Sequence, residues 1–134
     1  MTFSPPTRFS INLPVLMKAG QAYKIWHGTL PRIPRVSRYT LGARIDQLFV
    51  EVMEFLLLAG YSREKTNKIS VLATVSTKLD ALKFLLQTAW ELKIIDNGEY
   101  ARIAEPVIMV GLDIGKWRKM LVNDNPSDET SEGL

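Results

Sequence analysis

The residues of this chain that could do chemistry are arginines and lysines, and the chemistry is phosphate binding. In the stretch LPRIPRVSRYTLGARI, three arginines recur at every third position: Arg32, Arg35 and Arg38. The guanidinium group of arginine contacts phosphate oxygens through a planar, bidentate fork. Pro31 and Pro34 predict an extended backbone here, in which helical neighbours would not sequester the arginine side chains. This stretch is therefore the first candidate for a nucleic-acid contact.

A second group of bases lies in two further segments: Arg63, Lys65 and Lys68, and Lys116, Arg118 and Lys119. The segment 116–119 falls in the last turns of an expected helix, where basic side chains offset the negative end of the helix dipole. The segment 63–68 falls at the start of an expected helix, where the dipole opposes positive charge, so a phosphate role explains it better. No aromatic residue alternates with the bases of 63–68 or with the arginines of 32–38, so these patterns do not indicate base stacking.

Other reactive side chains are few in this sequence. The chain has no cysteine and one histidine, His27, which excludes thiol chemistry and a metal site built from several histidines. Four carboxylates lie between apolar positions of the expected helices: Glu51, Glu54, Asp80 and Glu91. We expect them to solvate a helix face or to form ion pairs with Arg44, Lys78 or Lys83. The prediction is a protein that is not an enzyme and that uses no metal and no cofactor.

The charge is unevenly spread along the chain. The formal net charge is +3, but residues 123–134 contain four acids and no base. Residues 1–122 therefore hold all 17 bases and 10 of the 14 acids, a formal +7 that suits an anionic partner. A solubilising acidic tail on a mildly basic domain explains the same distribution equally well.

The composition predicts a soluble, cytoplasmic protein that does not cross a membrane. The lack of cysteine fits a reducing compartment. The first residues, MTFSPPTRFSINLPVLMKAG, have no uninterrupted apolar core of the kind that a signal peptide needs. The richest apolar run, 48–60, contains Glu51 and Glu54 and is too short to span a bilayer.

Helical periodicity predicts four helices that must position these bases, and no strand pattern competes with it. The expected helices cover residues 14–30, 38–60, 63–95 and 97–122. Each has apolar side chains at spacings of three and four, which mark one buried face. Pro106 lies well past the first turn of the fourth helix, so we expect a kink or a break there.

The joints after the second and third helices are only a residue or two long, and such joints force neighbouring helices to run antiparallel. The predicted fold class is all-α: an antiparallel, up-down-up-down four-helix bundle whose fourth helix is kinked near Pro106. We expect an N-terminal extension (1–13), a bundle domain (14–122) and a flexible acidic tail (123–134). This topology would place Lys93 at the same end of the bundle as the three arginines of the proline-containing stretch.

The second and third helices have more apolar surface than one bundle core needs. The third helix carries a second apolar stripe: Ala81, Phe84, Leu85, Thr88, Leu92 and Ile95. Surplus apolar surface on a soluble helix usually meets a partner, and self-association is the simplest form of this. A wide stripe that packs against two neighbours within one chain explains the pattern equally well.

Three stretches together carry a resemblance to a known family: RYTLGARIDQLFVEVMEFLLLAGYS (38–62), KLDALKFLLQTAWELKIID (78–96) and GLDIGKWRKML (111–121). They resemble the Avd-like four-helix bundle family, the accessory variability determinants of diversity-generating retroelements. More distantly, they resemble the bundle proteins encoded in intervening sequences of large ribosomal RNA genes. The resemblance covers about residues 20–121.

The matching positions fall at the starts, cores and ends of the helices: Arg38, Leu41 and Gly42; Leu79, Asp80 and Leu82; Gly111, Gly115 and Trp117. Only the basic character transfers to the other candidates: Arg32, Arg35, Arg63, Lys65 and Lys68. The chain departs from the family pattern at Lys116, where many relatives have a glycine, and at Pro106.

The resemblance implies a homo-oligomer, a pentamer of barrel-like shape with a basic surface. Such proteins bind the reverse transcriptase of the retroelement and its template RNA or cDNA. They support mutagenic retrohoming without catalysing a reaction. The alternative hypothesis is a structural oligomer of the same fold that binds another protein and has no nucleic-acid role.

Replacing all three arginines of the proline-containing stretch with glutamate distinguishes a phosphate-binding role of this stretch from a structural role. A phosphate-binding stretch would lose nucleic-acid affinity and keep its helicity and assembly. A competing view makes Arg38 structural, paired with a carboxylate such as Asp96 at the same end of the bundle. On that view, the change would first lower the melting temperature.

Overall fold

The computed structural model describes the backbone of residues 13–133 and the side chains of residues 14–123. These residues form five α-helices and one 3-10 turn and contain no strand, so the predicted all-helical class is confirmed. In chain order the elements are α1 (Leu13–Thr29), η1 (Leu30–Arg32), α2 (Arg35–Tyr39), α3 (Leu41–Tyr61), α4 (Lys65–Glu91) and α5 (Asn97–Gly133). Apart from Leu13, the expected N-terminal extension lies outside the described residues.

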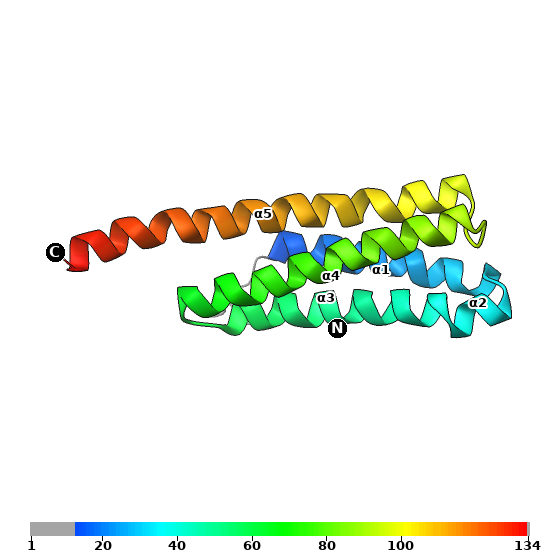
Figure 1. The fold of residues 1–134 in the computed structure, drawn as a ribbon, viewed down its shortest axis with the longest axis horizontal. Coiled ribbons are helices and arrows are strands. Elements are labelled where there is room, and N and C mark those ends of the chain that lie inside the picture. The colour runs from blue at the N-terminus through cyan, green and yellow to red at the C-terminus, as the bar shows by residue number, and fades with distance from the viewer. Residues whose placement is uncertain (1–12, 134) are drawn as a thin grey trace, which may run out of the picture.

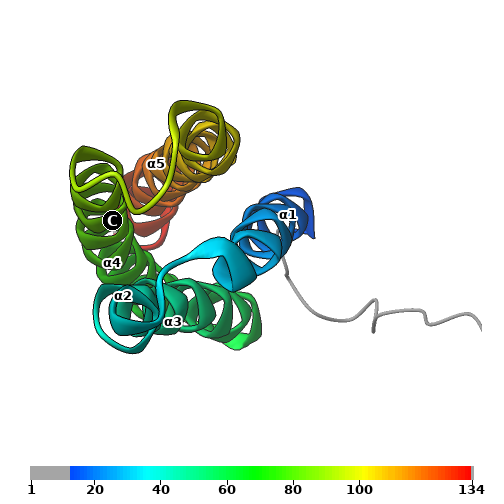
Figure 2. The same ribbon diagram turned by 90° about the vertical axis from the view of Figure 1, so that its right-hand side faces the viewer.

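The four long helices α1, α3, α4 and α5 lie side by side along one direction (Figure 1). α3 packs along α4, α4 packs along α5, and α1 packs against both α5 and α3. Seen end-on, these helices surround a common interior (Figure 2). The short α2 packs on α3, at the end of the molecule where α4 turns into α5 (Figure 1). We call this end, which consists of η1, α2 and the joint 92–96, the α2 end.

Side chains that recur every three or four residues along each long helix fill the interior. Four members of the apolar stripe of α3 are buried: Ile45, Leu48, Val52 and Ala59. Trp26 of α1 is the largest of the fully buried side chains, and its indole N–H donates to Asp46 Oδ1 of α3 at 3.2 Å. The one polar atom of this tryptophan is therefore satisfied, and its ring stabilises the contact of α1 with α3 through buried apolar area.

Gly42 allows α3 to begin close beside α2. A Cβ atom at this position would lie 3.0 Å from the carbonyl oxygen of Ser37 and 4.0 Å from Leu30 Cδ2. The nearer atom belongs to the backbone and cannot swing aside, so a larger residue would push α2 away from α3. Gly115 differs, because a Cβ atom there would have no described atom within 4 Å. Packing within one chain therefore accounts for Gly42 and does not account for Gly115.

Most of the proline-containing stretch is helical, so the predicted extended conformation is wrong for the three arginines. Only Ile33 and Pro34, which lie between η1 and α2, have an extended backbone, with ψ angles of 134° and 143°. Pro31 lies inside η1, and Pro34 directly precedes α2. Proline is tolerated at the start of a helix, because the first N–H groups of a helix have no partner within it. The expected second helix, 38–60, is consequently two helices, α2 and α3, which Thr40 separates through a non-helical ψ of −96°.

α5 is one uninterrupted helix from Asn97 to Gly133. It passes through Pro106 without the break that we considered, and a kink at this position stays a prediction. Pro106 cannot donate to the carbonyl oxygen of Arg102, but Arg102 is exposed, so water can reach that side of the helix. The backbone of α5 also continues into the segment 123–134 that we expected to be a separate acidic tail.

Apolar side chains remain exposed on the outer face of α4 and α5. Phe84 is 68% exposed, and Ile108 and Leu112 border a hollow of about 200 Å³ between the two helices. Phe84 and Leu92, both exposed, belong to the second apolar stripe that the sequence indicated. This surface is local, and no helix of the described part is long and apolar enough to cross a membrane.

Candidate nucleic-acid interface

Arg32 connects η1 to the start of α5 at the α2 end. Its Nε donates to Glu99 Oε2 at 2.9 Å. The Arg32 side chain is 62% exposed, whereas the Glu99 side chain is 9% exposed. The nearly buried carboxylate therefore accepts from one edge of the guanidinium group, while the other N–H groups remain available to solvent and to a phosphate.

Glu99 is fixed by a reciprocal capping arrangement. The backbone N–H of Asp96 donates to Glu99 Oε1 at 2.9 Å, and the backbone N–H of Glu99 donates to Asp96 Oδ1 at 2.7 Å. Two N–H groups that the helix itself cannot satisfy thus find partners, and two carboxylates lie at the positive end of the helix dipole. The Asp-x-x-Glu spacing in DNGE is a sequence signal for this cap, but our reading of the sequence did not use it.

Arg38 has a structural role, and its partner differs from the one that the competing view named. Its Nη2 donates to the carbonyl oxygen of Ile33 at 3.1 Å rather than to Asp96. Its Nε is buried and has no partner among the described residues. Arg35, by contrast, is exposed, and its Cζ lies 5.9 Å from the centroid of the Tyr39 ring, which is also exposed. Of these two arginines, Arg35 is the one that can reach a ligand.

Two further cations join the α2 end through the joint between α4 and α5. Lys93 is exposed and has a φ of 62°, a left-handed conformation that turns the chain from α4 toward α5. Arg102 Nη1 lies close to the first turn of α5, because a Cβ atom built on Gly98 would be 3.3 Å from it. The sequence analysis placed Lys93 at this end but missed Arg102, whose position depends on the side-chain conformation.

Lys68 is buried at the opposite end, where α3 turns into α4, which we call the α3–α4 end. Its Nζ donates to the carbonyl oxygen of Ala59 in the last turn of α3 at 2.9 Å. Carbonyl oxygens in a last turn have no helical partner and carry the negative end of the dipole, so they stabilise this ammonium group. Burial lowers the pKa of Lys68. We therefore leave Lys68 out of the proposed interface.

The other predicted bases are spread over different faces of the α3–α4 end. Arg63, Lys116 and Lys119 are exposed, and Lys65 is half-buried. Arg118 is half-buried too, and its Nε has no partner among the described residues. Positions two residues apart do not share a helix face, so Arg118 points away from Lys116.

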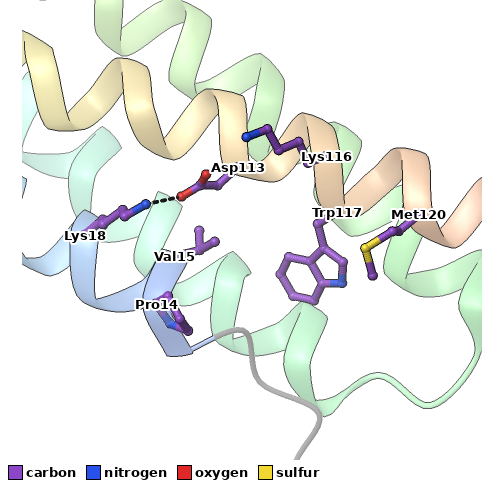
Figure 3. A pocket seen from close by; sticks show the side chains of 7 residues that line it. All are labelled: Pro14, Val15, Lys18, Asp113, Lys116, Trp117 and Met120. Carbon is purple, nitrogen blue, oxygen red and sulfur yellow. Dashed lines mark hydrogen bonds and ion pairs between the residues drawn. The ribbon is translucent and has the colours of Figure 1, made fainter.

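Lys116 borders a groove of about 290 Å³ between α1 and α5 (Figure 3). Trp117 extends from α5 toward the beginning of α1, and Met120 lies beside it (Figure 3). Lys18 Nζ and Asp113 Oδ2 form an ion pair of 2.6 Å across the groove. Asp113 thus offsets part of the positive charge here, and the groove is a weaker candidate for an anion than the α2 end.

Of the four carboxylates that could have suggested catalysis, Glu51 and Asp80 form ion pairs, whereas Glu54 and Glu91 are exposed. Glu51 Oε1 accepts from Lys78 Nζ at 3.0 Å and lies 3.9 Å from Arg44 Nη1. Asp80 pairs with Lys83 at 3.4 Å. Hydrogen bonds from Gln47 and Lys78 hold the pKa of Glu51 below its usual range. The described residues also contain no cluster of histidine and carboxylate side chains that could hold a metal ion.

Neither a protein-family model nor a curated protein matches this chain. The candidate interface is therefore defined by the cations that the fold brings together at the α2 end: Arg32, Arg35, Lys93 and Arg102. Four exposed cations on one end can neutralise phosphates and release their counterions, which gives binding that depends on salt rather than on base sequence.

Proposed function

We propose that this chain is a non-catalytic accessory protein of a diversity-generating retroelement. It binds nucleic acid, as template RNA or cDNA, together with a reverse transcriptase, and it supports mutagenic retrohoming in the cytoplasm. The basis is the resemblance of residues 20–121 to the Avd-like family together with the exposed cations of the α2 end. The observation that carries the nucleic-acid role is the excess of exposed cations over exposed acids at this end, where Asp96 is the exposed acid of the joint 92–96. Arg35 and Lys93 are exposed, while Glu99 is almost fully covered.

The proposed fold is an antiparallel, up-down-up-down four-helix bundle formed by the long helices. The packing of α3 on α4, of α4 on α5 and of α1 on both α3 and α5 supports it. The proposed assembly is a homopentamer. The exposed apolar side chains of α4 and α5 support an assembly, because a monomer would leave Phe84, Ile108 and Leu112 in water. Closed symmetry would repeat each α2 end around a ring and so multiply its charge.

Fluorescence anisotropy with a labelled single-stranded RNA tests the nucleic-acid role. We expect an affinity that falls steeply between about 50 and 200 mM salt, because each neutralised phosphate of a single strand makes the slope of log affinity against log salt steeper by about 0.7. Light scattering on the same samples gives the size of the assembly. Absence of binding at the lowest salt, in a sample that is folded and assembled, would contradict the nucleic-acid role.

The second candidate function is a structural oligomer that binds another protein and has no nucleic-acid role. The hollow between α4 and α5, where Ile108 and Leu112 lie beside Asp80 and Lys83, favours it, because this surface could accept a partner helix as readily as a second copy. Gene context separates the two functions. A reverse transcriptase gene and an imperfect template repeat beside this gene favour the accessory role, and an isolated gene favours the structural one.

A further inference from the structure

Trp90 holds a fixed and partly exposed aromatic ring at the α2 end. It stacks on Tyr100 with a centroid distance of 5.0 Å and an interplanar angle of 12°. Its Nε1 donates to Asn97 Oδ1 at 2.6 Å. One side chain of α4 is thus oriented by two side chains of α5, yet 37% of Trp90 remains exposed. A ring that is held in one orientation loses little conformational entropy when a ligand stacks on it.

A hollow of about 310 Å³ lies directly beside this ring. Its lining consists of the joint residues and the start of α5: Trp90, Lys93, Ile95, Asp96 and Asn97. One oxygen of each polar side chain is engaged, since Asp96 Oδ1 accepts from the Glu99 N–H and Asn97 Oδ1 accepts from Trp90. Asp96 is exposed and adds a negative charge to the lining, and Ile95 is almost fully covered. The hollow therefore offers a planar ligand mainly the indole ring of Trp90.

Three cations lie at or near this hollow. Lys93 lines it directly. The Arg102 guanidinium group lies against Gly98, next to Asp96. Arg32 reaches the same turn through Glu99. An aromatic ring beside several cations is the arrangement with which proteins hold a single strand, because the ring stacks on a base and the cations contact the adjoining phosphates.

We propose that Trp90 is a stacking platform for an unpaired base of single-stranded nucleic acid, with Lys93 and Arg102 at the neighbouring phosphates. The inference rests on the proposed function only in taking nucleic acid as the ligand. It adds a site, a strand preference and a contact with a base. The sequence did not reveal this site, because no base lies directly beside Trp90 in the chain and Arg102 reaches the same turn only in the folded protein.

The test is the affinity of the full chain, carrying Trp90→Ala, for three labelled oligonucleotides of equal length. One is an ordinary single strand, one is a strand with abasic sites, and one is a duplex. Stacking contributes about 1–3 kcal/mol per base, so the variant should bind the ordinary single strand about 5- to 150-fold more weakly. It should bind the abasic strand and the duplex as the wild type does. Trp90→Phe should recover most of the loss, because phenylalanine keeps an aromatic face.

Two controls distinguish the loss of stacking on a base from a change in the structure of the joint 92–96. Trp117→Ala removes an indole from the groove between α1 and α5 and should leave all three affinities unchanged. Asn97→Ala removes the hydrogen bond to the indole but keeps the ring, so its single-strand affinity should stay close to that of the wild type. Circular dichroism and thermal unfolding of every variant show whether it is folded.

Two results would overturn the stacking site while leaving the proposed function in place. One is an unchanged single-strand affinity in folded Trp90→Ala. The other is an equal loss for ordinary and abasic strands, which would show that the ring acts only through the structure of the joint. If the wild type binds none of the three oligonucleotides, the proposed function fails first and the stacking site falls with it.

Discussion

The α2 end and the α3–α4 end use their cations differently. At the α2 end, Arg35 and Lys93 are exposed, and Arg32 shares only one edge of its guanidinium group with Glu99. At the α3–α4 end, Arg63, Lys116 and Lys119 are exposed on different faces, but Lys68 is buried and its ammonium group closes the last turn of α3. Both ends therefore display positive charge, and the α3–α4 end also uses one positive charge to complete its own helix.

This difference shows that the number of bases in a segment does not give the charge that a ligand meets. The segment 63–68 has three bases, as many as the stretch 32–38. In each segment, one base donates a hydrogen bond to a backbone carbonyl oxygen and is therefore not free to contact a ligand. These bases are Lys68 in the first segment and Arg38 in the second. The α2 end regains cations from elsewhere in the chain, because the joint and α5 bring Lys93 and Arg102 to it.

The strongest test of the comparison is the charge reversal Lys68→Glu. It places a carboxylate in a buried position against the carbonyl oxygens of α3, with no cation to compensate. We expect the free energy of unfolding to fall by about 3–5 kcal/mol, as measured by urea denaturation. Arg63→Glu, an exposed reversal at the same end, is the matched control and should change stability by less than about 0.5 kcal/mol. Equal unfolding midpoints for the two variants would show that Lys68 is not part of the core of this end.

Glu99→Ala tests the α2 end in the same way with a smaller expected effect. It removes the acceptor of the Arg32 Nε–H and of the Asp96 N–H together. The expected loss is about 1–3 kcal/mol, since a capping interaction and a charge-assisted hydrogen bond disappear. Glu105→Ala, an exposed change on the same helix, is the control. If both variants melt at the temperature of the wild type, the α2 end does not depend on this carboxylate.

The two ends should also differ in their contribution to nucleic-acid binding. Replacing Arg35 and Lys93 with glutamate should weaken single-strand binding about tenfold or more and lower the magnitude of the salt slope by about 1.4, because two phosphate contacts are lost. The matched pair, Arg63→Glu with Lys119→Glu, reverses the same amount of charge at the α3–α4 end and should change both quantities much less. Equal effects of the two pairs would mean that binding follows the net charge of the chain and not the α2 end.

The smallest effect is expected from Glu51, whose ion pairs join α3 to α4 between the two ends. Its pKa is lower in the folded chain than in the unfolded chain, so its contribution to stability is present at neutral pH and is lost as the protein takes up the proton. Stability should therefore fall as the pH drops below about 4, and Glu51→Gln should reduce this fall by less than about 1 kcal/mol. Unfolding curves at neutral and acidic pH measure it, with exposed Glu54→Gln as the control. An identical pH profile for Glu51→Gln and the wild type would remove Glu51 from the interactions that stabilise the bundle.

Much of the helical fold could be predicted from the sequence, because the spacing of apolar residues is a local property and marks the face of each helix that is buried. The stripe that contains Ile45, Leu48 and Val52 is buried as expected. The conformation of the proline-containing stretch was predicted wrongly. Proline disrupts the interior of a helix but is tolerated at its start, and Pro31 and Pro34 lie at the starts of η1 and α2. Pro106 lies within α5, and the helix nevertheless continues through it.

The candidate site was less predictable, because its contacts connect residues that are far apart in the chain. Arg32 and Glu99 are separated by 67 positions, and Trp90 meets Asn97 only after the left-handed turn at Lys93. The partner of Lys68, nine residues earlier, is a backbone carbonyl, which has no signature in the amino-acid sequence. The capping pair Asp96 and Glu99 is the exception, since its spacing is visible in the sequence.

The burial of Lys68 also makes this side chain a reporter for motion. Reagents that modify amines should label exposed lysines such as Lys93 and Lys119 quickly, whereas the Lys68 amine can react only when the turn between α3 and α4 opens. The rate of labelling at this one lysine, followed by mass spectrometry, thus records how often the turn opens in the native protein.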